Sequence, residues 1–226
     1  CAPTRASLIT GQYQHKAGVG YFSNDLGLPA YQGYINNESL TIAEVLRSNG
    51  YITATSGKWH VSGNGKSLPW DRGFDLVFPK QERNADSGAP TFKSQTDSDG
   101  YPLESSFSTE VINREAEGFL DQIKTQDKPF FLYLAHTAPH WPLVALPQDI
   151  AKYKGRYDKG WEAIRQERFE RQKLLGLTPV NTEASIPDED IYDWSRLSYD
   201  QRQLWAKKME IFAAMVDRLD QTVGKL

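Results

Sequence analysis

One continuous apolar run, residues 130–135, constrains the fold of this chain more than any other segment. Such a run, with no alternating polar residues, predicts a strand buried on both faces, as in a parallel sheet covered by helices. A second strand is predicted at residues 51–56, after a helix that Thr41 begins and Asn49-Gly50 ends. The order helix, strand, loop, helix, strand predicts an α/β domain of three layers, α/β/α, with a mostly parallel central sheet.

The remaining segments fill in this outline. Residues 80–105 are polar and rich in turn residues, which predicts a surface excursion. Residues 147–200 are charged and interrupted by Gly and Pro, which predicts a partly helical surface insertion within the domain. Residues 201–226 predict an amphipathic helix. Its expected buried stripe consists of Leu204, Met209, Phe212, Met215, Val216, Leu219 and Val223.

Composition excludes several classes of protein. The 226 residues carry a net charge of -3, which gives no reason to expect nucleic-acid binding. One cysteine excludes an internal disulfide. No apolar run approaches the length of a membrane span, and no signal peptide is visible.

The first chemical pattern is Cys-x-Pro-Thr-Arg at residues 1–5, followed by Thr-Gly at 10–11. Residues 5–10 are predicted to begin a helix that Thr4 caps, and a helix N-terminus offers backbone N–H donors to an anion. Arg5, one turn along, can reach back to Cys1. Taken alone, Cys1 is open to other interpretations: a buried small side chain, a lipidated N-terminus or a free thiolate nucleophile.

Two further patterns follow the two predicted strands. Gly-Lys-Trp-His at residues 57–60 comes after the first strand, and Ala-Pro-His-Trp-Pro at residues 138–142 comes after the second. The carboxyl ends of strands are where α/β sheets place their ligand sites. The i, i+2 spacing of Lys58 and His60 puts both on one side if the chain stays extended. His136, close before the second pattern, is predicted to be a structural histidine.

Together these patterns resemble the signatures of the formylglycine-dependent type I sulfatases, in the alkaline phosphatase superfamily. The resemblance covers essentially the whole chain and implies that Cys1 is oxidised to formylglycine. It implies that Arg5 supports this nucleophile, that Lys58 contacts it and the sulfate, and that His60 takes its proton. It implies that His140 binds the substrate and stabilises or protonates the leaving group.

Two weaker points accompany these roles. His15, in the loop after the first pattern, is a further candidate for lining the substrate cleft. The stretch Trp-Asp-Arg-Gly-Phe-Asp at residues 70–75 is similar to an element of the same family, where a structural role is expected.

The resemblance also implies what lies outside the chain. Family members hold one divalent cation, most often Ca²⁺, with Mg²⁺ as the alternative, among oxygen ligands. Of these ligands only Cys1, as formylglycine, falls within residues 1–226, so the chain is expected to be part of a sulfatase catalytic domain that lacks the first strand and the C-terminal part. Such a piece is expected to expose a sheet edge or apolar surface. A formylglycine-generating or sulfatase-maturating enzyme is the implied partner, and a periplasmic, secreted or lysosomal-type location is implied.

The predicted function is therefore hydrolysis of small-molecule or saccharide sulfate monoesters. Three alternatives stay open: hydrolysis of phosphonate or phosphate esters with the same nucleophile, a catalytically incomplete fragment that binds sulfated glycans, and a thiol hydrolase built on Cys1 and a histidine. The last predicts inhibition by iodoacetamide and full activity after chelation.

Overall fold

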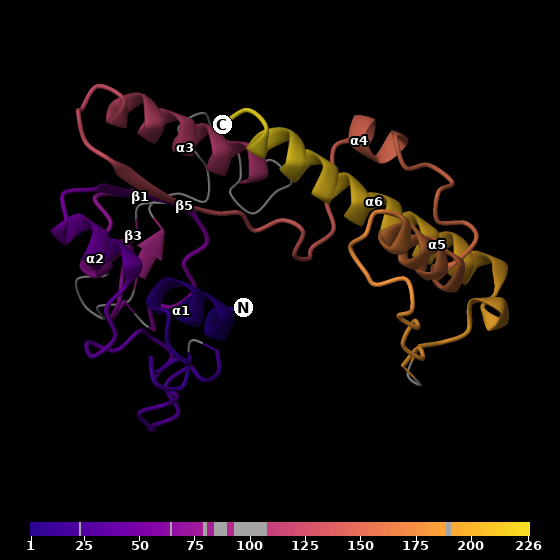
Figure 1. Cartoon of the computed structure of the whole chain (residues 1–226), viewed down its shortest axis with the longest axis horizontal. Coiled ribbons are helices and arrows are strands. Elements are labelled where there is room, and N and C mark those ends of the chain that lie inside the picture. Colours follow the sequence, from indigo (N-terminus) through magenta and orange to yellow (C-terminus); the bar gives the residue numbers. More distant parts are fainter. Residues whose placement is uncertain (23, 64, 79–80, 84–89, 93–107, 189–190) are drawn as a thin grey trace. The chain divides into compact units, whose positions relative to one another are not determined.

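The computed structural model covers residues 1–226 and describes residues 1–22, 24–63, 65–78, 81–83, 90–92, 108–188 and 191–226. The segment 80–105, predicted as a surface excursion, therefore lies largely outside the described residues. The chain divides into two compact units, Cys1–Thr137 with Thr222–Leu226, and Ala138–Gln221. Figure 1 traces the elements of both units along the chain.

The first unit alternates helices and strands. In chain order it contains α1 (Ala2–Thr10), α2 (Ile42–Ser48), β1 (Ile52–Gly57), the 3₁₀ helix η1 (Pro69–Arg72), β2 (Leu76–Phe78), β3 (Gln81–Arg83), β4 (Pro90–Phe92), α3 (Ser108–Ile123) and β5 (Phe130–Ala135). One sheet has the strand order β2-β1-β5 with both pairs parallel, and β3 pairs with β4 antiparallel. The predicted parallel sheet is confirmed.

Helices cover both faces of the parallel sheet (Figure 1). Phe119 of α3 shares a buried cluster with Ile52 of β1, against which Leu132 of β5 packs. Phe131 and Tyr133, the neighbours of Leu132 along β5, pack instead against the larger cluster to which α1 and α2 contribute. Because successive residues of a strand point to opposite faces, this alternation places helices above and below the sheet. The three-layer α/β/α arrangement is confirmed.

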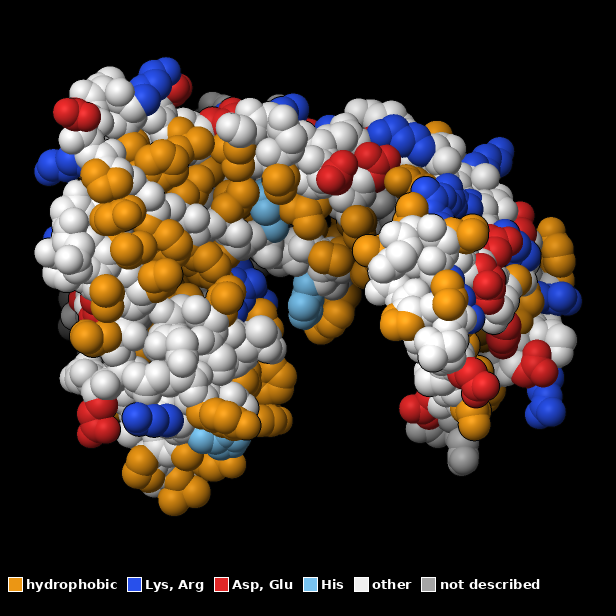
Figure 2. Space-filling view, viewed as in Figure 1, with side chains coloured by type: hydrophobic (Ala, Val, Ile, Leu, Met, Phe, Trp, Pro, Cys, Tyr) orange, Lys and Arg blue, Asp and Glu red, His pale blue; other side chains and the backbone are white. Residues whose placement is uncertain are grey.

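The burial of β5 differs from the prediction. The first five residues of β1 are buried, whereas in β5 only Ala135 is buried and Phe130 is 49% exposed. In the described sheet β5 pairs on one side only, with β1, so its outer edge and part of its apolar surface stay open. Figure 2 shows apolar side chains gathered over the upper part of the first unit. An exposed apolar surface was expected, but full burial of residues 130–135 was wrong.

Arg72 fixes the loops beside β1. Its side chain is 6% exposed and donates to the backbone carbonyls of Ile35 and Ser39. It also forms an ion pair with Glu44 at 3.0 Å. Thr41 and Glu44 form a capping box at the start of α2, as predicted for Thr41. Burial alone would raise the pKa of Glu44, but hydrogen bonds from Arg72 and Thr41 hold that pKa below its ordinary value. The structural role predicted for the segment around Arg72 is thus confirmed.

The second unit is helical. It contains α4 (Pro147–Ala151), α5 (Trp161–Leu174), the 3₁₀ helix η2 (Trp194–Arg196) and most of α6 (Tyr199–Val223). The segment 147–200 therefore includes helices, and its status as an insertion within a catalytic domain stays a prediction. None of the helices in the described ranges combines the length and apolar character needed to cross a bilayer.

The buried side of α6 is not the predicted stripe. Leu204, Met209, Val216 and Val223 are each at least 39% exposed, and of that stripe Met215 is buried. The other residues of α6 that are buried are Ala206, Glu210, Ala214 and Thr222. Because these residues are small or, in Glu210, paired, the turn after α4 can lie close to α6. There the amide of Gly155 donates to Glu210 Oε1 at 2.7 Å. The prediction of the buried side of α6 from hydrophobicity alone was therefore wrong.

Asp149 carries the main buried ion pair of the second unit and supports a stability prediction. Its side chain is 1% exposed and accepts from Arg218 at 2.6 and 2.8 Å, with Lys152 at 3.1 Å. We expect Asp149→Asn to lower the free energy of unfolding of the complete protein by about 3 kcal/mol, because it removes the charge of a buried carboxylate that pairs with Arg218 and Lys152. Denaturant titration of the wild type and the variant measures this difference.

The same ion pair predicts a pH dependence. Burial alone would raise the pKa of Asp149, but hydrogen bonds from Arg218, Lys152 and Gln221 outweigh it and lower that pKa. The stabilisation is therefore complete above the unfolded value of about 3.9 and is lost as the pH falls through the lower folded value. Asp121→Asn is the matched control, since Asp121 and its partner Lys124 are each 70% exposed, and should cost less than about 1 kcal/mol. An equal decrease in the free energy of unfolding in the two variants would contradict the prediction.

Candidate active site

Cys1 lies at the N-terminus of α1. The helix begins at Ala2, three residues earlier than predicted, so Cys1 rather than Thr4 is the N-cap residue. The reason is that Pro3 suits the first turn, where a missing N–H costs nothing. Ala2, Ala6 and Ile9 are buried and anchor α1 to the core. Cys1 itself is exposed and makes no side-chain cap, so its Sγ atom is available for chemistry.

Arg5 joins three separate elements around Cys1. Its Nε donates to Cys1 Sγ at 3.1 Å. Its Nη1 donates to the carbonyl oxygen of Lys58 at 2.6 Å and to the Tyr133 hydroxyl of β5 at 3.0 Å. A planar guanidinium can serve several acceptors in fixed directions, which an ammonium group cannot. The structure thus brings Cys1, Arg5 and Lys58 together, as the sequence patterns required.

Gly57 allows the ends of β1 and β5 to meet closely. It has a φ of +113°, and a Cβ there would lie 2.2 Å from the carbonyl oxygen of Ala135. The amide of Lys58 donates to that same oxygen at 2.7 Å. A side chain at residue 57 would push the two strands apart, so glycine is required where the lysine leaves the sheet.

Lys58 is a half-buried cation beside a second cation. Burial lowers its pKa, and the nearby charge of Arg5 lowers it further. Two positive groups at one strand end create a site suited to an anion.

His60 follows Lys58 but not in an extended chain. β1 ends at Gly57, and His60 adopts a left-handed conformation with a φ of +64°. Between them Trp59 is buried, with its ring packed on Phe74 and its Nε1 donating to Ser67 at 2.7 Å. The assumption of an extended chain was therefore wrong. The buried Trp59 holds this segment in place, and the ring of His60 lies 6.4 Å from that of Phe22.

The other predicted histidines lie in different surroundings. His15 is exposed, and its ring packs edge-on against Tyr31 at 5.5 Å. His140 belongs to the second unit, is exposed, and contacts Trp141 through its ring and through Nδ1 at 2.7 Å from the carbonyl oxygen. Their participation at Cys1 stays a prediction. His136 is half-buried at the end of β5, and burial lowers its pKa, which favours the neutral ring.

Sequence reasoning missed Tyr133 and Phe22. Tyr133 stands in an apolar run, and its hydroxyl is the only side-chain polar group there, which was the available signal. Phe22 carries no motif, and its nearness to His60 depends on how the loop after α1 folds.

The residues at this site do not by themselves fit a divalent cation. Within the described ranges, no group of three or more His, Cys, Asp or Glu side chains is close enough to hold a metal ion. The side chain that contacts Cys1 is that of Arg5, which also binds the Tyr133 hydroxyl and lies near the positive charge of Lys58.

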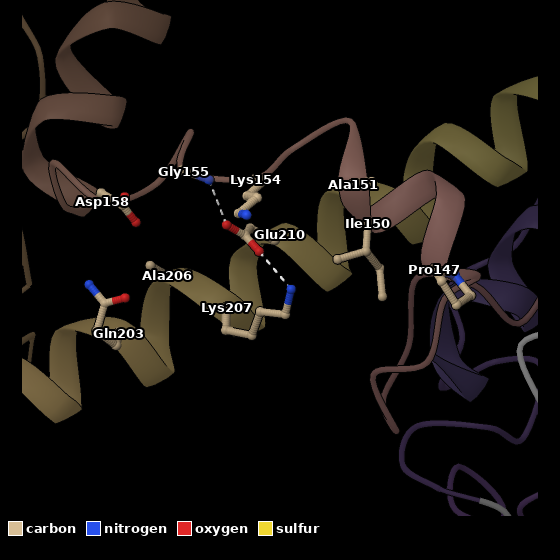
Figure 3. A pocket seen from close by; sticks show the side chains of 10 residues that line it. All are labelled: Pro147, Ile150, Ala151, Lys154, Gly155, Asp158, Gln203, Ala206, Lys207 and Glu210. Carbon is tan, nitrogen blue, oxygen red and sulfur yellow. Dashed lines mark hydrogen bonds and ion pairs between the residues drawn. The ribbon is translucent and has the colours of Figure 1, made fainter.

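A pocket of about 570 Å³ lies in the second unit, between α6 on one side and α4 with the segment that follows it on the other (Figure 3). Glu210 points into its centre, where it accepts from the amide of Gly155 and pairs with Lys207 at 2.9 Å. None of the motif residues lines it. Its central carboxylate is already satisfied, so it is not the candidate site.

Comparison with known proteins places these features in a family context. A family model described as Sulfatase matches residues 1–226. An uncharacterised sulfatase of Schizosaccharomyces pombe is 33% identical over the whole chain and 45% of its own length. An arylsulfatase of Klebsiella aerogenes is 28% identical over the whole chain and 51% of its own length. The chain thus spans about half the length of these relatives.

The fold is also shared with solved structures. The crystal structure of the putative sulfatase yidJ from Bacteroides fragilis superposes with a TM-score of 0.60 over 99% of this chain and 46% of that protein, at 16% identity. At this identity the similarity shows the fold alone.

Proposed function

The chain belongs to the sulfatase family, and from this we propose that the complete protein hydrolyses sulfate monoesters with Cys1, converted to formylglycine, as the nucleophile. The observation that carries the proposal is the arrangement of Arg5, which contacts Cys1 Sγ, the backbone of Lys58 and the hydroxyl of Tyr133. In this proposal the Sγ atom stands in for an oxygen of the hydrated aldehyde.

The hydrated aldehyde can release sulfate after the first attack, which a thiol or a single hydroxyl group cannot do in the same way. It carries two hydroxyl groups on one carbon. One oxygen attacks sulfur, the S–O bond to the alcohol breaks, and the alcohol leaves with a proton. The second hydroxyl then loses its proton, the carbon–oxygen bond to sulfate breaks, and the aldehyde re-forms and is hydrated by water. Sulfate is thus released without a second attack at sulfur.

Each residue has a place in these two steps. Arg5 and Lys58 stabilise the negative charge of the nucleophile and of the sulfate oxygens. His60 takes the proton of the second hydroxyl during release, and His140 supplies the proton to the leaving alcohol. Exposed Cys1 at the end of α1 also lies where backbone N–H groups favour an anion.

We propose a Ca²⁺ ion, or Mg²⁺ in its place, with carboxylate ligands from parts of the protein beyond residues 1–226. No step above is assigned to this ion, because the described residues do not fit it alone. A formylglycine-generating or sulfatase-maturating enzyme is the proposed partner, and a periplasmic, secreted or lysosomal-type location is proposed.

The direct test uses the complete protein, co-expressed with a formylglycine-generating enzyme. We expect intact-mass analysis to show the thiol of Cys1 replaced by an aldehyde, and 4-nitrophenyl sulfate to be hydrolysed faster than 4-nitrophenyl phosphate or a phenylphosphonate ester. An unmodified thiol under these conditions, or a preference for the phosphorus esters, would count against the proposal.

Chelation gives an independent prediction. Incubation of the modified protein with a chelator should abolish hydrolysis, and added Ca²⁺ should restore it, because the proposed ion is bound by oxygen ligands. Iodoacetamide should have little effect, since formylglycine has no thiol. Resistance to the chelator together with inactivation by iodoacetamide would favour a thiol hydrolase instead.

A further inference from the structure

An aromatic side chain, Phe22, lies beside the proposed catalytic residue His60, and neither Phe22 nor its neighbour Tyr21 is used by the chemistry above. Phe22 lies with its ring centre 6.4 Å from that of His60, with 35° between the ring planes. Tyr21 packs edge-on against Phe22 at 4.8 Å. Both remain half-exposed, Tyr21 at 50% and Phe22 at 49%, so neither is a core residue.

The segment before this pair is tightly fixed. Val19 is fully buried and pairs with Tyr31, and the amide of Gly20 donates to the carbonyl oxygen of Ala30 at 2.8 Å. A Cβ at Gly20 would lie 2.6 Å from the ring of His15 and 2.9 Å from that of Tyr31. Figure 2 shows apolar side chains at the lower end of the first unit, where Figure 1 draws the loops that follow α1. The aromatic pair thus extends from an anchored segment.

The charged groups of the site cannot distinguish one alcohol from another. Arg5 and Lys58 recognise the anionic sulfate, which every ester of this class shares. An exposed aromatic ring binds flat apolar faces through its large contact area and its quadrupole. Phe22 provides such a surface next to His60, two residues along from Lys58.

We infer that Phe22, supported by Tyr21, is a specificity-determining residue that stacks on the ring of the alcohol part of the substrate. The preferred substrates are then sulfate esters of alcohols with a flat ring face, an arene or a pyranose, rather than of acyclic alcohols. The substrate class rests on the proposed function, whereas the ring-binding surface is testable without turnover.

Binding of sulfonates, which cannot be hydrolysed, tests the ring-binding surface separately from the proposed hydrolysis. The probes are benzenesulfonate, 6-deoxy-6-sulfoglucose and the acyclic propanesulfonate, titrated calorimetrically into the complete protein. We expect the wild type to prefer the ring sulfonates. Phe22→Ala should weaken binding of the preferred ring by about tenfold and leave propanesulfonate within about twofold. The ring sulfonate whose affinity falls more in Phe22→Ala identifies the class of alcohol.

Three controls make the result specific. Phe22→Tyr should restore the preference, because it keeps an aromatic face. Tyr13→Ala should leave it unchanged, since Tyr13 is 78% exposed in the same loop. Affinity for inorganic sulfate should be the same in all variants, because the charged groups are untouched.

The inference is overturned if Phe22→Ala leaves the ratio of ring to acyclic affinity unchanged, or if all sulfonates and sulfate weaken equally, which would indicate that Phe22 only supports His60. Loss of ring preference in Phe22→Ala, in a protein that hydrolyses no sulfate ester, would support the ring site and reject the proposed function. Hydrolysis of sulfate esters, with a ratio of ring to acyclic affinity that Phe22→Ala leaves unchanged, would support the proposed function and reject the ring site.

Discussion

Replacement of Cys1 by Ala is expected to abolish hydrolysis of sulfate esters by the complete protein. Removing a covalent nucleophile costs several orders of magnitude in kcat in enzymes of this kind, roughly 10³-fold or more. The fold should be unaffected, because Cys1 is exposed and forms no side-chain cap on α1. Initial rates with 4-nitrophenyl sulfate and the thermal midpoint of the same preparations measure both effects.

Cys1→Ser gives the more informative result. A serine hydroxyl can attack sulfur once, but it has no second hydroxyl on the same carbon to expel sulfate. We expect a burst of one product per protein molecule, followed by a stable sulfated serine that intact mass can detect. Continuous turnover by the Ser variant at rates near those of the wild type would reject the hydrate mechanism.

The parts of the fold that were predictable follow local rules. The parallel pairing of β1 with β5 follows from two predicted strands with a helix between them along the chain. The start of α2 at Thr41 follows from a capping box three residues apart. In each case the pattern of residues within one segment carries the information about that element.

The parts that were missed depend on contacts between distant residues. Which strand is buried depends on sheet order, and β5 lies at the edge of the described sheet while β1 lies at its centre. The buried side of α6 was wrong because Glu210, a charged residue, is satisfied by Gly155 far away in sequence. The nearness of Phe22 to His60 depends on loop packing that no periodic pattern encodes.

The candidate site was predicted unevenly for the same reason. Cys1 and Arg5 are one helical turn apart, so their contact follows from spacing alone. The contacts of Arg5 with Lys58 and Tyr133 join residues far apart in sequence. The position of Lys58 after a predicted strand and the family resemblance pointed to Lys58. Tyr133 had no such support and emerged from the structure.

The second large expected effect concerns Arg5. We expect Arg5→Lys to lower kcat for sulfate ester hydrolysis by about 100-fold, because an ammonium group cannot serve Cys1, the Lys58 carbonyl and Tyr133 together, and small misplacements of a nucleophile are costly. The resemblance implies that Arg5 is also read during formylglycine formation. Rates are therefore divided by the modified fraction measured by intact mass.

Two variants separate position from charge. Arg47→Lys is the matched control, because Arg47 is 53% exposed in a surface ion pair with Asp75 and should leave kcat unchanged. Tyr133→Phe removes only one of the contacts of Arg5 and should raise the activation free energy by about 1 kcal/mol, or about fivefold in rate. If Arg5→Lys had the same kcat as the wild type at an equal fraction of formylglycine, the positive charge alone would account for the role of residue 5. The graded order Arg47→Lys, Tyr133→Phe, Arg5→Lys is instead what a guanidinium that positions the nucleophile requires.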